Sequence, residues 1–156
     1  MLRPETPAIT ERRLKLELRL AQMKEMESCR GNFLHYVKKV WPEFVGGAHH
    51  TMIAKKFEAI ATGENKRLII NMPPRHTKSE FASYLFPSWI IGRAPKTKII
   101  QTTHTAELAV NFGRKVRNLL DTDTYNSIFD GVELQQTARL RDGGQRTMEE
   151  NTLLLA

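Results

Sequence analysis

The sequence predicts an α/β fold, in which a helical N-terminal region leads into the beginning of an incomplete parallel sheet. Up to residue 63, apolar residues recur at helical spacing among strong helix formers. Two strand-like stretches follow, the apolar run 68–70 and the segment 97–102, and each precedes a turn and a helix-like stretch. Strand, turn and helix repeated in this order is how a parallel sheet begins. We therefore expect a helical region at 1–63 and a partial α/β core at 64–134.

Composition limits the range of functions. The chain has 156 residues, 40% of them hydrophobic, which is enough for one ordinary domain with a core. Its net charge of +7 favours a polyanionic partner, nucleic acid before a membrane surface. Cys29 is the single cysteine, which excludes an intrachain disulfide and favours an intracellular location. No apolar run approaches the roughly 20 residues of a membrane span. We expect nucleic acid and no membrane as the partner.

The first predicted helix covers residues 11–28, a stretch without glycine or proline. Its apolar residues form two stripes, and such a helix can touch two neighbours or a partner chain. Because a helix that lies across its own domain is the commoner case, we expect that arrangement. The stripes consist of Leu14, Leu18 and Ala21, and of Leu16, Leu20 and Met23.

Two further helices are predicted before the first strand. Asn32 is suited to cap a helix over 33–40, where the apolar residues fall at i, i+4 and i+7. A third helix runs from about His50 to Thr62, with Gly63 at the position where glycine ends helices. The pair His49-His50 is a poor metal chelator, because adjacent residues on a helix point about 100° apart.

After residue 64 the pattern changes. Residues 68–70, between Arg67 and Asn71, are a continuous apolar run typical of a strand buried on both faces. A helix follows from Ser79 to about Ile91, and Pro87 is expected to bend or shorten it.

The second predicted strand is 97–102. It is followed by a helix that Thr103 or Thr105 can cap and that ends at residues 121–123. In that helix the apolar residues fall on one face, whereas basic residues such as Arg114 lie towards solvent.

The turn between the first strand and its helix, MPPRHTKSE, ends in Lys78-Ser79. A Walker A loop has the form G-x-x-x-x-G-K-[ST] and binds the phosphates of a nucleotide. When the two are aligned on Lys78, Thr77 and Met72 stand where the two glycines belong. The similarity therefore depends on the setting, an apolar run before the turn and a helix after it, rather than on the pattern itself.

The chemistry of such a site assigns roles to these residues. Lys78 would reach the β- and γ-phosphates of ATP, and the Ser79 hydroxyl would bind Mg²⁺. Arg75 would stabilise charge on the transferred phosphoryl group, unless it is a surface cation paired with an acidic neighbour. The predicted catalytic residues are thus Arg75 and Lys78. The predicted nucleotide-binding residues, including backbone N–H donors, are Pro74, Arg75, His76, Thr77, Lys78, Ser79 and Glu80.

These residues also carry a resemblance to a known family. NMPPRHTKSEFASYLFPSW, followed by KIIQTTHTAELAVNFGRKVRNL, resembles the ATPase domain of phage terminase large subunits, the DNA-packaging motors, over roughly residues 40 to 134. That family uses a loop of the form PPRHxKSE as a deviant Walker A. The resemblance implies a P-loop NTPase-type sheet that binds ATP and Mg²⁺. It also implies double-stranded DNA, the portal protein and a small terminase subunit as partners, in the cytoplasm of a bacterial host. By position, Phe44 and His50 are candidates for contacts with the adenine.

Two parts of the family pattern are missing from the sequence. No apolar strand ends in a Walker B carboxylate, and no nuclease domain follows. We expect a truncated ATPase domain that at most binds ATP. Residues 135–156 lose the resemblance, but a shifted reading frame allows STDSKAAGRWTTNNGGEYFAVG, which is similar to the family. We therefore expect 135–156 to be an out-of-frame, poorly ordered tail, which the genomic nucleotide sequence would test.

Two other functions fit the same residues. The chain is a non-enzymatic basic nucleic-acid-binding module if the loop serves only as a phosphate clamp. It is a helicase-like NTPase fragment if the loop belongs to that class, although helicases usually keep the loop glycines. Nucleotide binding that depends on Lys78 separates the first alternative from a terminase-type site.

Overall fold

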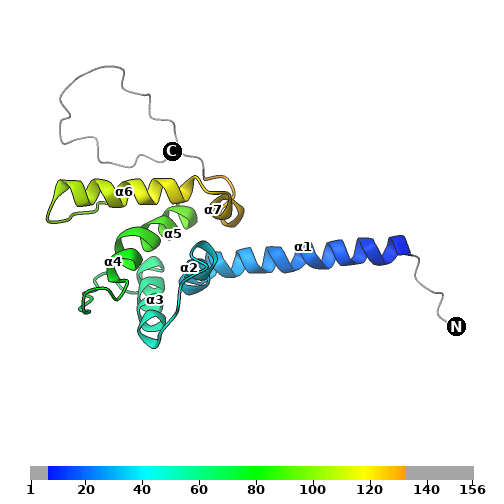
Figure 1. Ribbon diagram of the computed structural model, residues 1–156, viewed down its shortest axis with the longest axis horizontal. Coiled ribbons are helices and arrows are strands. Elements are labelled where there is room, and N and C mark those ends of the chain that lie inside the picture. Colours follow the sequence, from blue (N-terminus) through cyan, green and yellow to red (C-terminus); the bar gives the residue numbers. More distant parts are fainter. Residues whose placement is uncertain (1–6, 133–156) are drawn as a thin grey trace, which may run out of the picture.

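The computed structural model describes residues 7–132, with side chains from residue 10 onward, and in this part of the chain all regular structure is helical (Figure 1). Residues 135–156, predicted to be an out-of-frame tail, lie outside the described residues. The elements are α1 Pro7–Gly31, α2 Phe33–Val40, α3 Ala48–Ala61, α4 Lys78–Glu80, the π-helical turn η1 Phe81–Leu85, α5 Phe86–Arg93, α6 Ala106–Leu120 and α7 Asp123–Ile128.

The predicted α/β fold is wrong for this part of the chain. Residues 68–70 and 97–102 form no strand, and no backbone hydrogen bond joins the two segments. An apolar run shows that residues favour burial, but a strand also needs a neighbour that pairs with its N–H and C=O groups. Ile69 and Ile100 are instead 87% and 90% exposed. The P-loop NTPase-type sheet is therefore not seen within 7–132.

The helices that the sequence predicted are confirmed, together with their end signals. Asn32 caps α2, because its side-chain oxygen accepts a hydrogen bond from the His35 N–H at 2.9 Å. Thr105 rather than Thr103 caps α6. Gly63, after α3, has the positive φ of +79° that favours glycine at this position. The short helix α7 was not predicted.

The three elements α4, η1 and α5 follow one another without a break from Lys78 to Arg93. In η1 the N–H of Phe86 donates to the carbonyl of Phe81, five residues back. Pro87, which has no N–H to donate, comes directly after this wider turn. Pro87 therefore does not shorten the helix, since the local change of hydrogen-bond spacing accommodates it.

The core is a cluster of aromatic rings around the fully buried Phe33. Rings from α2, α3, η1 and α5 meet there, so helices before and after residue 64 share one core. Trp89 also ties α5 to the end of α1, because its indole N–H donates to the Cys29 carbonyl at 3.0 Å. The rings whose centroids lie 5.4–6.3 Å from that of Phe33 belong to Tyr36, Phe57, Phe81, Phe86 and Trp89.

Polar groups inside this core satisfy one another. The buried Ser88 hydroxyl donates to the Leu85 carbonyl at 2.8 Å, so it accepts from the Tyr36 hydroxyl at 2.7 Å. The Tyr125 hydroxyl donates to the Ser88 carbonyl at 2.8 Å. Burial raises the pKa of both tyrosines, so both hydroxyls stay protonated and can donate. These bonds hold α2 and α7 against α5.

Helix α1 projects away from the other helices (Figure 1). Its leucines from Leu14 to Leu20 are 53–65% exposed and Met23 is 69% exposed. The expectation that this helix lies across its own domain is therefore wrong for all but its C-terminal end, which packs through Met26 and Cys29. Among the described residues, no helix is long and apolar enough to cross a membrane.

Two helical glycines provide a test of this packing. A Cβ on Gly92 would lie 2.4 Å from the Phe129 ring, whereas one on Gly113 would meet nothing within 4 Å. We expect Gly92→Ala to destabilise the chain by about 1–3 kcal/mol through overpacking. Gly113→Ala should stabilise it by about 0.5–1 kcal/mol. Urea unfolding of both variants checks this, and equal effects would contradict the packing of α5 on Phe129.

Candidate functional site

The predicted phosphate-binding loop lies between the irregular segment at 68–70 and the first turn of α4. In Figure 1 it is at the left, near α3 and α4. A hydrogen bond from His50 on α3 to Thr77 fixes this neighbourhood. The loop is largely open to solvent: Pro74, Arg75 and His76 are exposed, and Thr77 is partly buried.

Two residues of the loop adopt backbone conformations that favour glycine. Thr77 has φ 57° and ψ 8°, and Arg75 has φ 65°. Left-handed backbone costs a non-glycine residue about 1–2 kcal/mol, and a β-branched residue such as Thr77 is a particular outlier. Thr77 stands where the second Walker A glycine belongs, so the chain takes up a glycine-like conformation there without a glycine.

A continuous series of hydrogen bonds holds Thr77. The Gly47 N–H donates to His50 Nδ1 at 2.9 Å, which leaves the proton of the neutral ring on Nε2. His50 Nε2–H then donates to Thr77 Oγ1 at 2.6 Å, and the Thr77 hydroxyl donates to the His76 carbonyl at 2.7 Å. His50 is 6% exposed. Thus α3 and the loop are joined through one buried imidazole.

A histidine cluster, formed by His49, His50 and His76, surrounds these bonds. The ring centroids of His49 and His50 are 3.8 Å apart, and those of His49 and His76 are 6.1 Å apart. His76 Nδ1 donates to the Pro74 carbonyl at 2.9 Å and so bridges Arg75. Burial, and then the two neighbouring histidines, lower the pKa of His50. The His50 ring is therefore held neutral, as its hydrogen bond from Gly47 requires.

Lys78 turns back over the loop. Its Nζ donates to the Met72 carbonyl at 3.2 Å, so the two ends of the Walker-like pattern meet in space. The ammonium group is partly buried there, beside the start of the helix. This position agrees with the role predicted for Lys78, which stays a prediction.

The first turn of α4 offers further groups to an anion. The N–H groups of Lys78, Ser79 and Glu80 have no carbonyl one turn earlier to bind, and none donates to another part of 7–132. The Ser79 hydroxyl is exposed and makes no hydrogen bond to a described residue. Glu80 pairs with Lys115 of α6 at 2.9 Å, so its carboxylate is used between helices.

Arg75 is exposed and forms no ion pair with any residue in 7–132. The alternative that it is a surface cation paired with an acidic neighbour is therefore not seen in this part of the chain. In the same part no group of three or more His, Cys, Asp or Glu side chains is arranged to hold a metal. A Mg²⁺ bound at Ser79 would depend on phosphate oxygens for its other ligands.

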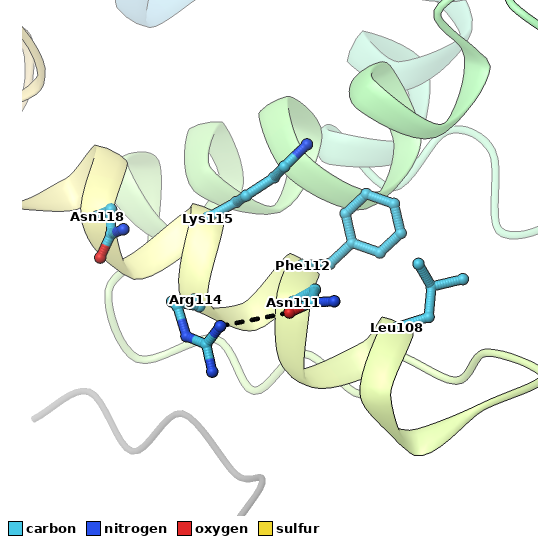
Figure 2. A pocket seen from close by; sticks show the side chains of 6 residues that line it. All are labelled: Leu108, Asn111, Phe112, Arg114, Lys115 and Asn118. Carbon is cyan, nitrogen blue, oxygen red and sulfur yellow. Dashed lines mark hydrogen bonds between the residues drawn. The ribbon is translucent and has the colours of Figure 1, made fainter.

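A second feature lies on α6. A hollow of about 370 Å³ lies beside this helix. Figure 2 shows its described lining residues, which all belong to α6. Arg114 donates to Asn111 through a hydrogen bond of 3.4 Å. Lys115 connects the hollow to α4, because it donates to the Glu80 carboxylate. Amide and cationic groups of this kind can donate to phosphates. The lining residues are Leu108, Asn111, Phe112, Arg114, Lys115 and Asn118.

Comparisons with protein-family models, curated proteins and solved structures find no match for the chain. Sequence reasoning considered His50 for a metal and for adenine, and missed its bonds to Gly47 and Thr77. The spacing Gly47-x-x-His50 was an available indication, because a side chain at the third helical position often accepts from the N-cap N–H.

The lowered pKa of His50 gives a testable pH dependence of stability. Below the ordinary histidine pKa of about 6.5, the unfolded chain binds a proton at this residue that the folded chain does not. The stabilising contribution of the neutral His50 should therefore be fully present above about pH 6.5, and the free energy of unfolding should decrease as the pH falls below that value. Glutamine at this position cannot titrate. We therefore expect the difference in the free energy of unfolding between wild type and His50→Gln to change by up to about 1.4 kcal/mol per pH unit. Parallel stability curves from urea unfolding would contradict a neutral, buried His50.

Proposed function

We propose that the chain binds ATP with Mg²⁺ through the loop from Pro74 to Glu80, as a member of the terminase type of packaging ATPase. The observation that carries this proposal is the position of Lys78. Its ammonium lies over the loop, 3.2 Å from the Met72 carbonyl, next to first-turn N–H groups that bind no other part of 7–132. A phosphate chain is complementary to this arrangement, because it is negatively charged and accepts hydrogen bonds from the ammonium and from the free N–H groups at the start of the helix.

The residues present fit ATP and Mg²⁺. The N–H groups of Lys78, Ser79 and Glu80 can donate to phosphate oxygens, and the Lys78 ammonium can exchange its bond to the neutral Met72 carbonyl for an ion pair with a phosphate oxygen. The Ser79 hydroxyl is free to bind the metal ion. Arg75 remains available to the terminal phosphate because no described residue pairs with it. When bound, Mg·ATP supplies an activated phosphoryl group, and these side chains orient it and balance its charge.

The resemblance of the loop and its flanking residues to terminase large subunits supports double-stranded DNA as the substrate of the assembly. The net charge of +7 agrees with such a partner. We propose the portal protein and a small terminase subunit as protein partners, and the cytoplasm of a bacterial host as the location, on the same resemblance.

Nucleotide binding by Lys78 can be measured directly. We expect Lys78→Ala to weaken binding of Mg·ATP at least tenfold in calorimetric titration, because a charged hydrogen bond contributes about 1.5–3 kcal/mol. Lys24→Ala removes the same charge from the exposed part of α1 and should leave the affinity unchanged. Equal affinity in all three proteins would contradict the proposed site.

A second function, nucleic-acid binding without nucleotide, is favoured by the amide and cationic groups on α6 (Figure 2). Titration with duplex DNA at several salt concentrations separates the two. If Arg114→Gln reduces the salt dependence of DNA binding, and neither wild type nor the variant binds Mg·ATP, this second function replaces the first. If Mg·ATP binds and depends on Lys78, the ATP-binding proposal stands, whatever the DNA affinity.

A further inference from the structure

Building on the proposed ATP-binding function, we propose that His50 is a positioning residue, which holds the phosphate-binding loop in the shape that glycine gives to other Walker A loops. His50 acts through the hydrogen bond of 2.6 Å between its Nε2 and Thr77 Oγ1. His50 comes from α3, 27 residues before Thr77, and would not itself touch the nucleotide through this nitrogen.

The loop needs such support because its backbone is unfavourable for its residues. Glycine adopts positive φ freely, whereas Thr77 at φ 57° and Arg75 at φ 65° do not. Conformations of this kind persist only where surrounding structure imposes them. Thr77 directly precedes Lys78, so its backbone sets the direction of the first-turn N–H groups. If Thr77 relaxed to negative φ, the phosphate-binding groups would no longer converge.

The donors and acceptors along this path have one consistent arrangement. Nδ1 of His50 accepts from the Gly47 N–H, so Nε2 carries the proton and donates to Thr77 Oγ1. The threonine hydroxyl then gives its own proton to the His76 carbonyl at 2.7 Å. The Thr77 side chain is thus fixed on both sides. A glycine at this position would adopt the positive φ without such support, and it would have no side chain for His50 to bind.

His50 is itself held firmly. Its ring lies against Phe44 and Phe81, with centroids 4.8 Å and 5.1 Å away. Phe81 is 1% exposed and belongs to the helix that Lys78 begins. The imidazole therefore packs between Phe44 and Phe81, and its hydrogen bond to Thr77 links the loop to the buried core.

Two amide variants separate the role of each ring nitrogen. In His50→Gln the side-chain Nε2 can still donate to Thr77, whereas in His50→Asn the Oδ1 can still accept from Gly47 but does not reach Thr77. Both variants lose the ring contacts with Phe44 and Phe81. We expect His50→Asn to bind Mg·ATP about tenfold more weakly than His50→Gln, equal to about 1.4 kcal/mol. The thermal unfolding temperature of each variant measures the loss of ring packing that the two variants share.

A glycine at position 77 provides the decisive comparison. In a Thr77→Gly background the loop no longer depends on His50, so His50→Asn should reduce Mg·ATP affinity much less than it does with Thr77 present. A purely structural role for His50 would give the same loss in both backgrounds. Additive effects in this double-mutant cycle, or equal affinities for the Asn and Gln variants, would overturn the inference.

A measurement without nucleotide distinguishes this inference from the proposed function. In ligand-free wild type, the ¹⁵N shifts of the imidazole should show His50 protonated at Nε2, and the Thr77 backbone shifts should show positive φ. His50→Asn should move the Thr77 shifts towards ordinary values, and His50→Gln should not. If wild type binds no Mg·ATP but these shifts behave as expected, the nucleotide proposal fails and the positioning role stands. Unchanged Thr77 shifts in His50→Asn would overturn the positioning role.

Discussion

The packing of Phe33 at the centre of the aromatic cluster is the interaction on which the rest of the structure depends. Its ring is fully buried and contacts rings from α3, η1 and α5, so it fixes these helices relative to α2. Phe81, one of these neighbours, also contacts His50, which in turn donates to Thr77. The shape of an exposed loop is thereby set by a buried core. Through that connection the core supports Thr77 in a conformation that threonine disfavours, together with the bonds of Thr77 to the Phe81 N–H and the His76 carbonyl.

This connection explains how the loop can hold a glycine-like backbone at Thr77 without a glycine. Glycine achieves the required backbone locally, at a cost in the entropy of the unfolded chain. Here the same backbone is enforced from outside, by hydrogen bonds from His50 and His76 to neighbouring groups. The arrangement leaves the N–H groups after Thr77 free and turns Lys78 towards them. A strained loop held by a rigid support is a common property of binding sites.

The helices could be predicted from the sequence because their signals are local. Asn32 caps α2 and the apolar spacing of 33–40 falls on the buried face, so neighbouring residues alone determined this helix. Strand formation at 68–70 could not be decided in the same way, since it depends on a partner elsewhere in the chain. For the site, the sequence located Lys78 and its helix. It could not give the positive φ of Thr77, which depends on His50 and is not a preference of threonine itself.

The central claim is that the first-turn N–H groups after Thr77 bind a phosphate chain. Its most direct test is the change in backbone amide NMR shifts of the full chain on addition of inorganic triphosphate with Mg²⁺. We expect the largest changes at Lys78, Ser79 and Glu80. Changes confined to α6, around Arg114, with none in the loop, would contradict it.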